Sequence, residues 1–246
     1  MINGNRRTET GSQVNIHTID LELRKKEVPP EIGELVQFVS TVIFPEHGDG
    51  NKLVGRWYPI YSQHPEKALP YLYLVFKDLY ELHRVSSKYN MPRLLECGSG
   101  FGIVGAAASI AGFETYNVEI QDAIHVQATQ YSQQLGQKGI VNPAMSHFIN
   151  GSYYTPTWFS YALDGYMRHN GLSEDSKYAC NMPGLVFELG LPHNVSKADI
   201  IKYLQVQRKK TGALMEHGVL NEHGFLDVDC IYTYPSDPFF NYAFPA

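Results

Sequence analysis

The most constraining feature of the sequence is a glycine-rich segment between an apolar stretch and a run of small residues. The apolar residues 94–95 precede three glycines at alternate positions, Gly98, Gly100 and Gly102, and the small and apolar residues 103–108 follow. This order predicts a strand, a turn and a helix. The glycines can adopt positive φ and let a ligand approach the backbone. The N–H groups at the start of the helix would face that ligand.

Acidic residues help to distinguish the ligands that such a turn can bind. Residues 100–105 fit G-x-G-x-x-G, the dinucleotide pattern. Glu96 comes just before the first glycine, where a carboxylate would repel a pyrophosphate and suit a ligand with a cationic amino group and no phosphate. Glu119 ends the next predicted strand, where its carboxylate can accept hydrogen bonds from both ribose hydroxyls. Glu119 therefore favours a nucleoside ligand, and Glu96 favours one that carries no phosphate.

Residues 96–102 follow the pattern E-x-G-x-G-x-G, which resembles motif I of the class I S-adenosylmethionine-dependent methyltransferases. The resemblance extends over about 91–155 and more loosely over 225–237. It implies that Glu96 lies near the methionine end of the cofactor and that Glu119 binds the cofactor ribose. The residues predicted to bind S-adenosyl-L-methionine are Glu96, Gly98, Gly100, Gly102, Glu119 and Asn150.

Two of the candidate residues have an alternative interpretation. Asn150 follows the third predicted strand and matches a family position that often contacts adenine, although Asp is more usual there; it is equally well explained as a turn residue beside Gly151. Tyr234 stands where the family's motif IV faces the methyl group, and amino-directed members often carry Asn or Asp at this point. Tyr234 could orient a substrate or act as a weak base, or it could only pack. The catalytic residue is otherwise unknown.

Composition and charge narrow the class of protein. The chain has 246 residues, 43% of them hydrophobic, which is enough for a substantial core. A net charge of −5 argues against a nucleic-acid partner. No apolar run is long enough to span a bilayer, so we expect no membrane partner. The first residues lack the apolar core of a signal peptide, and three scattered cysteines indicate reduced thiols, so we expect a cytoplasmic protein. The spacing of His217 and His223 does not fit a helical ligand pair, and no metal site is predicted.

The predicted fold class is α/β, with a Rossmann-like methyltransferase sheet. Residues 1–27 are expected to form a mobile arm, 28–90 an N-terminal helical cover, and 91–246 the cofactor-binding core. An insertion after the third strand, at about 155–223, could be a substrate lid or a structural elaboration of the sheet edge.

Hydrophobic periodicity and glycine or proline punctuation predict the individual elements. Helices are expected at about 30–43, 70–88, 102–111, 122–136 and 197–217, and strands at about 93–97, 114–119, 144–149 and 225–235. Pro45 is expected to break the first helix, and Pro65 could open the second. Gly136 and Gly139 are expected to end the helix that begins near 122.

The methyltransferase sheet normally continues beyond its fourth strand, whereas only residues 236–246 remain here. The fold is therefore predicted to lack the usual C-terminal strands. Because this tail is rich in aromatics, we expect it to cover an exposed sheet by forming a homo-oligomer.

Three functions are compatible with these observations. The leading hypothesis is an enzyme that transfers a methyl group from S-adenosyl-L-methionine to an unidentified acceptor. The first alternative is a noncatalytic methyltransferase-like module for binding or assembly, because the predicted sheet is incomplete. The second is an NAD-dependent oxidoreductase, because the dinucleotide pattern is also present.

Overall fold

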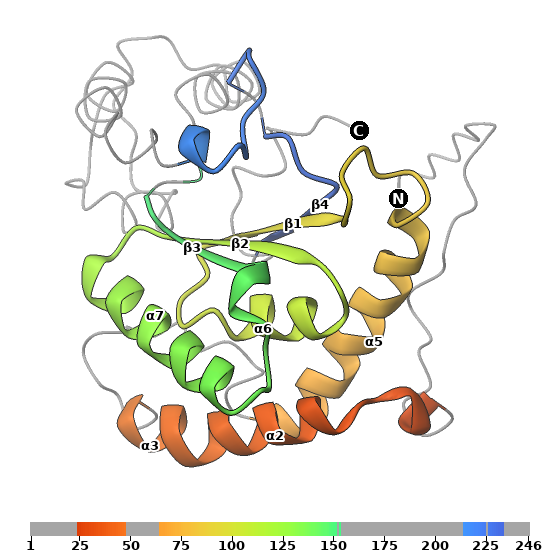
Figure 1. Cartoon of the computed structure of the whole chain (residues 1–246). Helices are drawn as coiled ribbons and strands as arrows, with labels where there is room; N and C mark the ends of the chain where they lie inside the picture. Colours follow the sequence, from red (N-terminus) through yellow and green to blue (C-terminus); the bar gives the residue numbers. More distant parts are fainter. Residues whose placement is uncertain (1–23, 48–63, 152, 154–213, 225, 234–246) are drawn as a thin grey trace, which may run out of the picture.

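The computed structural model describes residues 24–47, 64–151, 153, 214–224 and 226–233. Over these residues the chain is an α/β protein with a four-stranded parallel sheet of Rossmann-like architecture (Figure 1). The strands are β1 (Arg93–Cys97), β2 (Glu114–Glu119), β3 (Ser146–Asn150) and β4 (Cys230–Thr233). Their order across the sheet is β3-β2-β1-β4, so β1 and β2 are the inner strands.

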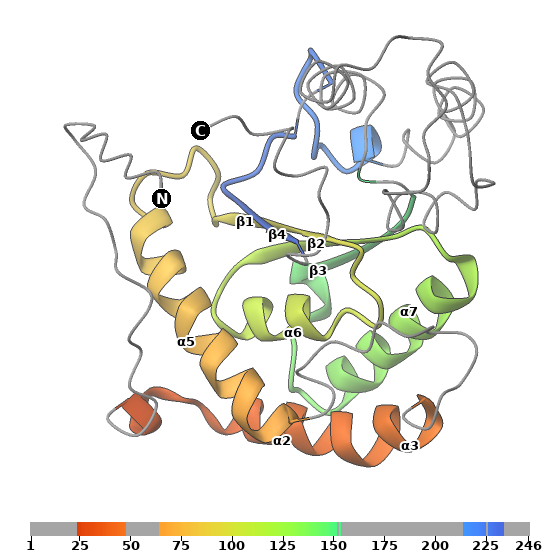
Figure 2. The same ribbon diagram turned by 180° about the vertical axis from the view of Figure 1, so that it is seen from behind.

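The helices that connect the strands lie on one face of the sheet. Helix α6 (Ile103–Ile110) joins β1 to β2, and α7 (Asp122–Gln137) joins β2 to β3. Parallel neighbours need such crossover connections, and their right-handedness places both helices on the same face. Helices α5 (Pro65–His83) and α2 (Pro30–Phe38) form a further layer beyond α6, whereas residues 214–224 lie on the opposite face (Figures 1 and 2).

Helix α6 is buried on all sides because it lies between the sheet and α5. Every residue from Ile103 to Ser109 is buried. A Cβ atom added to Gly105 would stand 1.8 Å from the Oδ1 atom of Asn117 on β2, so only a glycine permits this approach of helix to sheet. A helix that is apolar all round has to be buried in this way, and the small residues make the close packing possible.

The N-terminal helices build the outer part of the core. Leu69, Tyr73 and Phe76 recur on one face of α5 and are buried. Phe113, which is fully buried, packs edge-on against Phe76 and Tyr80 with ring centroids 6.4 and 5.6 Å away. The helical cover therefore packs on the sheet as part of one core.

The predicted end of the first helix is wrong. Helix α2 continues through a π-helical turn (Val39–Ile43) into the short helix α3 (Phe44–His47). Pro45 was expected to stop the helix because it lacks an N–H group. Pro45 lies in the first turn of α3, where a backbone N–H group has no acceptor within α3 to bond. The N–H of Phe44 donates to the carbonyl of Val39, which is the i→i+5 spacing of a π-helix.

The other boundaries follow the predictions unevenly. The strands predicted at 93–97 and 114–119 are confirmed, the third lies at Ser146–Asn150, and the fourth is shorter than predicted. Pro65 opens α5, but this helix ends at His83. Gly136 does not end α7. It lies inside the helix, where an added Cβ would come 2.4 Å from Pro143, and Gly139, with φ of 72°, follows the helix end.

Residues 24–27 pack against α5. Arg24 pairs with Asp78 at 2.7 Å, and Lys77 pairs with Glu27 at 3.0 Å. The remainder of the predicted arm, most of the predicted insertion, Tyr234 and the C-terminal aromatics lie outside the described residues.

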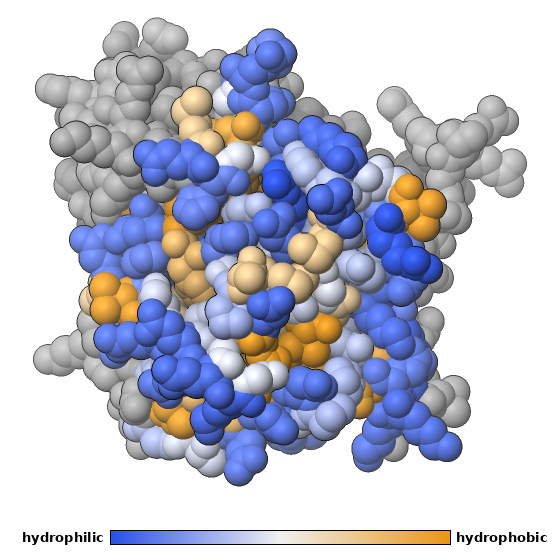
Figure 3. Space-filling model, in the orientation of Figure 1, coloured by the Kyte–Doolittle hydropathy of each residue, from blue (hydrophilic) through white to orange (hydrophobic). Residues whose placement is uncertain are grey.

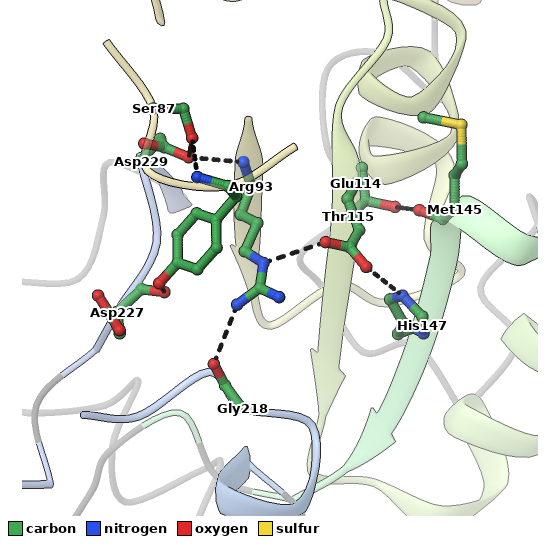
Figure 4. Close-up of polar contacts among 10 residues, drawn as sticks. Ser87, Arg93, Glu114, Thr115, Met145, His147, Gly218, Asp227 and Asp229 are labelled. Carbon is green, nitrogen blue, oxygen red and sulfur yellow. Dashed lines mark hydrogen bonds and ion pairs between the residues drawn. The ribbon is translucent and has the colours of Figure 1, made fainter. Parts of the chain in front are cut away.

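A polar network at the amino end of the sheet holds the segment that precedes β4 (Figure 4). The guanidinium of Arg93 donates to Glu114 at 3.0 Å and to the Gly218 carbonyl at 3.2 Å, and it lies 3.8 Å from the centre of the Tyr89 ring. The Nε2 atom of His147 lies within hydrogen-bonding distance, 3.1 Å, of the other carboxyl oxygen of Glu114. Burial disfavours the charge of Glu114, but its hydrogen bonds and the Arg93 cation hold its pKa below the ordinary value.

The visible surface is largely hydrophilic, with hydrophobic residues scattered among polar ones (Figure 3). Among the described residues, the large hydrophobic side chains that are exposed are Phe44, Leu82, Val85, Met91, Val126 and Met215. No helix among the described residues combines the length and apolar character that crossing a membrane requires.

Candidate functional site

At the carboxyl end of β1 the order of the strands changes direction across the sheet. From β1 the sheet continues through β2 to β3 on one side, and to β4 on the other. Open α/β sheets bind ligands outside the carboxyl ends of their strands at such a switch point. The glycine-rich turn, residues 98–102, directly follows β1 and therefore lies at this position.

The three alternate glycines all adopt left-handed backbone conformations. The φ angles are 69° at Gly98, 53° at Gly100 and 72° at Gly102. Gly102 caps the start of α6, and a Cβ there would come 2.5 Å from Phe148 on β3. Beside Gly100, by contrast, no described atom lies within 4 Å of where a Cβ would be. The backbone at Gly100 is therefore open to a neighbouring group, as a ligand-binding turn requires.

Several N–H groups of the turn already have acceptors within the protein. Gly100 donates to Oε2 of Glu119 at 3.0 Å, and Gly105 donates to Oε2 of Glu96 at 2.8 Å. Gly102 donates to the carbonyl of Ser99 at 2.8 Å. Two of these three acceptors are carboxyl groups: Glu119 bonds the turn itself, and Glu96 bonds the first turn of α6.

Glu96 lies beneath the first turn of α6. Its side chain is 2% exposed, and its register partner on β2 is Asn117, which is fully buried. Burial raises the pKa of Glu96 to about 8; the nearby charge of Glu119 acts in the same direction, and the Gly105 N–H opposes it. Glu96 is therefore directed at α6, where burial favours its uncharged form.

Glu119 ends β2 and holds the turn from the other side. It is 6% exposed, and besides Gly100 it accepts a hydrogen bond from the N–H of Gln121 at 2.8 Å. Burial raises the pKa of Glu119, and these backbone hydrogen bonds oppose the rise. Because a carboxylate has about four acceptor positions, the N–H groups of Gly100, Gln121 and Ile120 leave part of this capacity unused.

Asn150 lies beside Glu119 as its register partner on β3. Its Nδ2 atom donates to Asp122 Oδ1 at 2.8 Å, at the start of α7. Its own Oδ1 atom is buried and accepts no hydrogen bond from the described residues. A buried acceptor in this state is costly unless a ligand or water supplies a donor.

The fold thus brings all six predicted cofactor residues to one edge of the sheet, whereas Tyr234 lies outside the described residues. No family model, curated protein or solved structure matches the chain.

Two residues of the site were missed from the sequence. Ser99, in the turn, is 1% exposed, and none of the described residues bonds its hydroxyl. Asn117 lies under α6 in the middle of β2. A signal for Asn117 was present: it is a polar residue in a predicted buried strand, on the same face as Glu119. Nothing in the sequence distinguishes Ser99 from an ordinary turn serine.

A metal-dependent alternative finds no support in the described part of the chain. No group of three or more His, Cys, Asp or Glu side chains there is arranged to hold a metal ion.

Proposed function

We propose that the chain binds S-adenosyl-L-methionine at the glycine-rich turn and transfers its methyl group to an acceptor. The observation that carries this proposal is the hydrogen bond from Gly100 to the carboxyl group of Glu119, in an open left-handed turn at the switch point of the sheet. An acid at this position can accept ribose hydroxyls, which makes a nucleoside the ligand class that fits best.

The occupied N–H groups favour a nucleoside cofactor that carries no phosphate. A pyrophosphate needs unbonded N–H groups at the turn and at the start of the helix. Here Gly100, Gly102 and Gly105 donate within the protein, two of them to carboxyl groups. A phosphate would have to displace these bonds and approach the charge of Glu119, so a dinucleotide is disfavoured.

The residues present fit the parts of the proposed cofactor. Glu119 has acceptor capacity left for the ribose hydroxyls, and the unsatisfied Oδ1 of Asn150 can accept from the adenine amino group. The open side of Gly100 would let the cofactor lie against the backbone. The cofactor supplies a methyl group activated by a positively charged sulfur. The protein's part is to hold that group in line with the acceptor and exclude water.

Isothermal titration calorimetry tests the proposal. S-adenosylhomocysteine should bind the full chain, and NAD should not. In Glu119→Gln the affinity should fall about ten- to a hundred-fold, because a hydrogen bond to a charged group contributes about 1.5–3 kcal/mol. The control is Glu34→Gln, the same substitution at an exposed position of α2, which should bind like the wild type. Binding of NAD alone, or equal affinity in the two variants, would contradict the proposal.

A further inference from the structure

The side-chain amide of Asn117 has a defined orientation. Its Nδ2 atom donates to the carbonyl oxygen of His147 at 3.3 Å and to the hydroxyl of Thr115 at 3.4 Å. A carbonyl oxygen can only accept, so the nitrogen of the amide must face His147. The amide oxygen of Asn117 therefore points the other way, toward α6.

That oxygen lies close to the carboxyl group of Glu96. A Cβ placed on Gly105 would be 1.8 Å from Oδ1 of Asn117 and 3.0 Å from Oε2 of Glu96. The two residues are also direct register partners on β1 and β2, on the same face of the sheet. None of the described residues donates a hydrogen bond to Oδ1 of Asn117.

An ionised Glu96 would leave this arrangement unbalanced. A carboxylate can only accept, so two buried acceptors would lie close together, and the N–H of Gly105 bonds only Glu96. Unsatisfied buried acceptors are strongly disfavoured. A protonated carboxyl group removes the conflict, because a hydroxyl at Oε2 can donate to Asn117 while its oxygen still accepts from Gly105.

We infer that Glu96 keeps its proton at neutral pH and donates it to Oδ1 of Asn117, forming a neutral pair that positions the first turn of α6. Glu119 is then the only one of the two acids whose negative charge a ligand meets at the turn. This second statement rests on the proposed function, whereas the protonation of Glu96 does not.

The groups around Glu96 all agree with this assignment. Its register partners are Asn117 on β2 and Tyr232 on β4, and on α6 it accepts a hydrogen bond from Gly105. Of the described residues, Glu119 is the charged group that acts on it, and a like charge disfavours a second ionisation. The pKa of about 8 that burial produces is consistent with a proton held at pH 7.

Carboxyl carbon-13 NMR of the full chain, labelled at glutamate, tests the inference without any ligand. One glutamate resonance should be that of a protonated acid at pH 7 and should titrate near pH 8. It should be absent from Glu96→Gln. In Glu119→Gln it should remain but titrate at a lower pH, because the neighbouring charge is gone. This second variant keeps the test decisive if Glu96→Gln does not fold.

The inference is overturned if every glutamate resonance of the wild type is that of a carboxylate at pH 7, or if the protonated resonance persists in Glu96→Gln. The ligand statement is tested separately by titrating S-adenosylhomocysteine. Affinity should fall at least tenfold more in Glu119→Gln than in Glu96→Gln, and the reverse order would overturn it. If the wild type binds no S-adenosylhomocysteine, the proposed function fails while the NMR result still decides the protonation of Glu96.

Discussion

The protonation of Glu96 should make the stability of the protein depend on pH in an unusual direction. The folded state holds this proton up to a pKa of about 8, whereas the ordinary value is 4.5. Between these values the folded state binds more protons than the unfolded state, so stability falls as pH rises. The contribution is fully present below pH 4.5 and is lost as pH rises through 8.

The size of the effect follows from the displaced pKa. Each pH unit inside this window changes the free energy of unfolding by about 1.4 kcal/mol, so the loss from pH 5 to pH 8 is about 4 kcal/mol. Urea unfolding of the wild type and Glu96→Gln at several pH values measures it. The difference between the two proteins isolates Glu96, because other titrating groups such as Glu119 contribute to both.

Glutamine keeps a donor and an acceptor at this position but cannot ionise. The wild type should therefore lose stability relative to Glu96→Gln as pH rises, while Glu34→Gln should follow the wild type throughout. A difference that stays constant from pH 5 to pH 8, or one that grows in favour of the wild type, would refute the reasoning.

Two further comparisons test the packing and the polar network by urea unfolding. Gly105→Ala should lose about 1–3 kcal/mol because its Cβ would overlap Asn117, whereas Gly33→Ala, in open space on α2, should gain about 0.5–1 kcal/mol. Equal effects at the two glycines would contradict the packing of α6. Arg93→Met should cost about 1–3 kcal/mol because it removes the charged donor of the half-buried Glu114 carboxyl group, whereas Lys88→Met removes an ion pair whose lysine side chain is 63% exposed and should cost less than about 1 kcal/mol. A larger cost for the Lys88 variant would contradict the account of the network.

The sequence predicts the centre of the fold well because its signals there are local. The apolar stretch before Gly98, the alternate glycines and the small residues of α6 each constrain the backbone directly. The acid at the end of β2 follows from the same pattern. Sequence reasoning was less successful where a boundary depends on neighbours: Pro45 is accommodated by a π turn, and Gly136 is required by the approach of Pro143.

The direction of Glu96 could not be predicted from the motif alone. Its position before the first glycine indicated an ionised group facing a ligand. Which face of β1 it occupies depends on how the strand pairs with β2, and only this pairing brings it next to Asn117 and Gly105. Its protonation is a consequence of burial between two elements that are separate in the sequence.

Amide NMR of the full chain during titration with S-adenosylhomocysteine tests most directly whether the turn after β1 binds a nucleoside cofactor. The largest shifts should appear at the amides of Gly98, Gly100 and Gly102, and NAD should leave these resonances unchanged. Shifts confined to other parts of the protein, or a response to NAD and not to S-adenosylhomocysteine, would contradict the account.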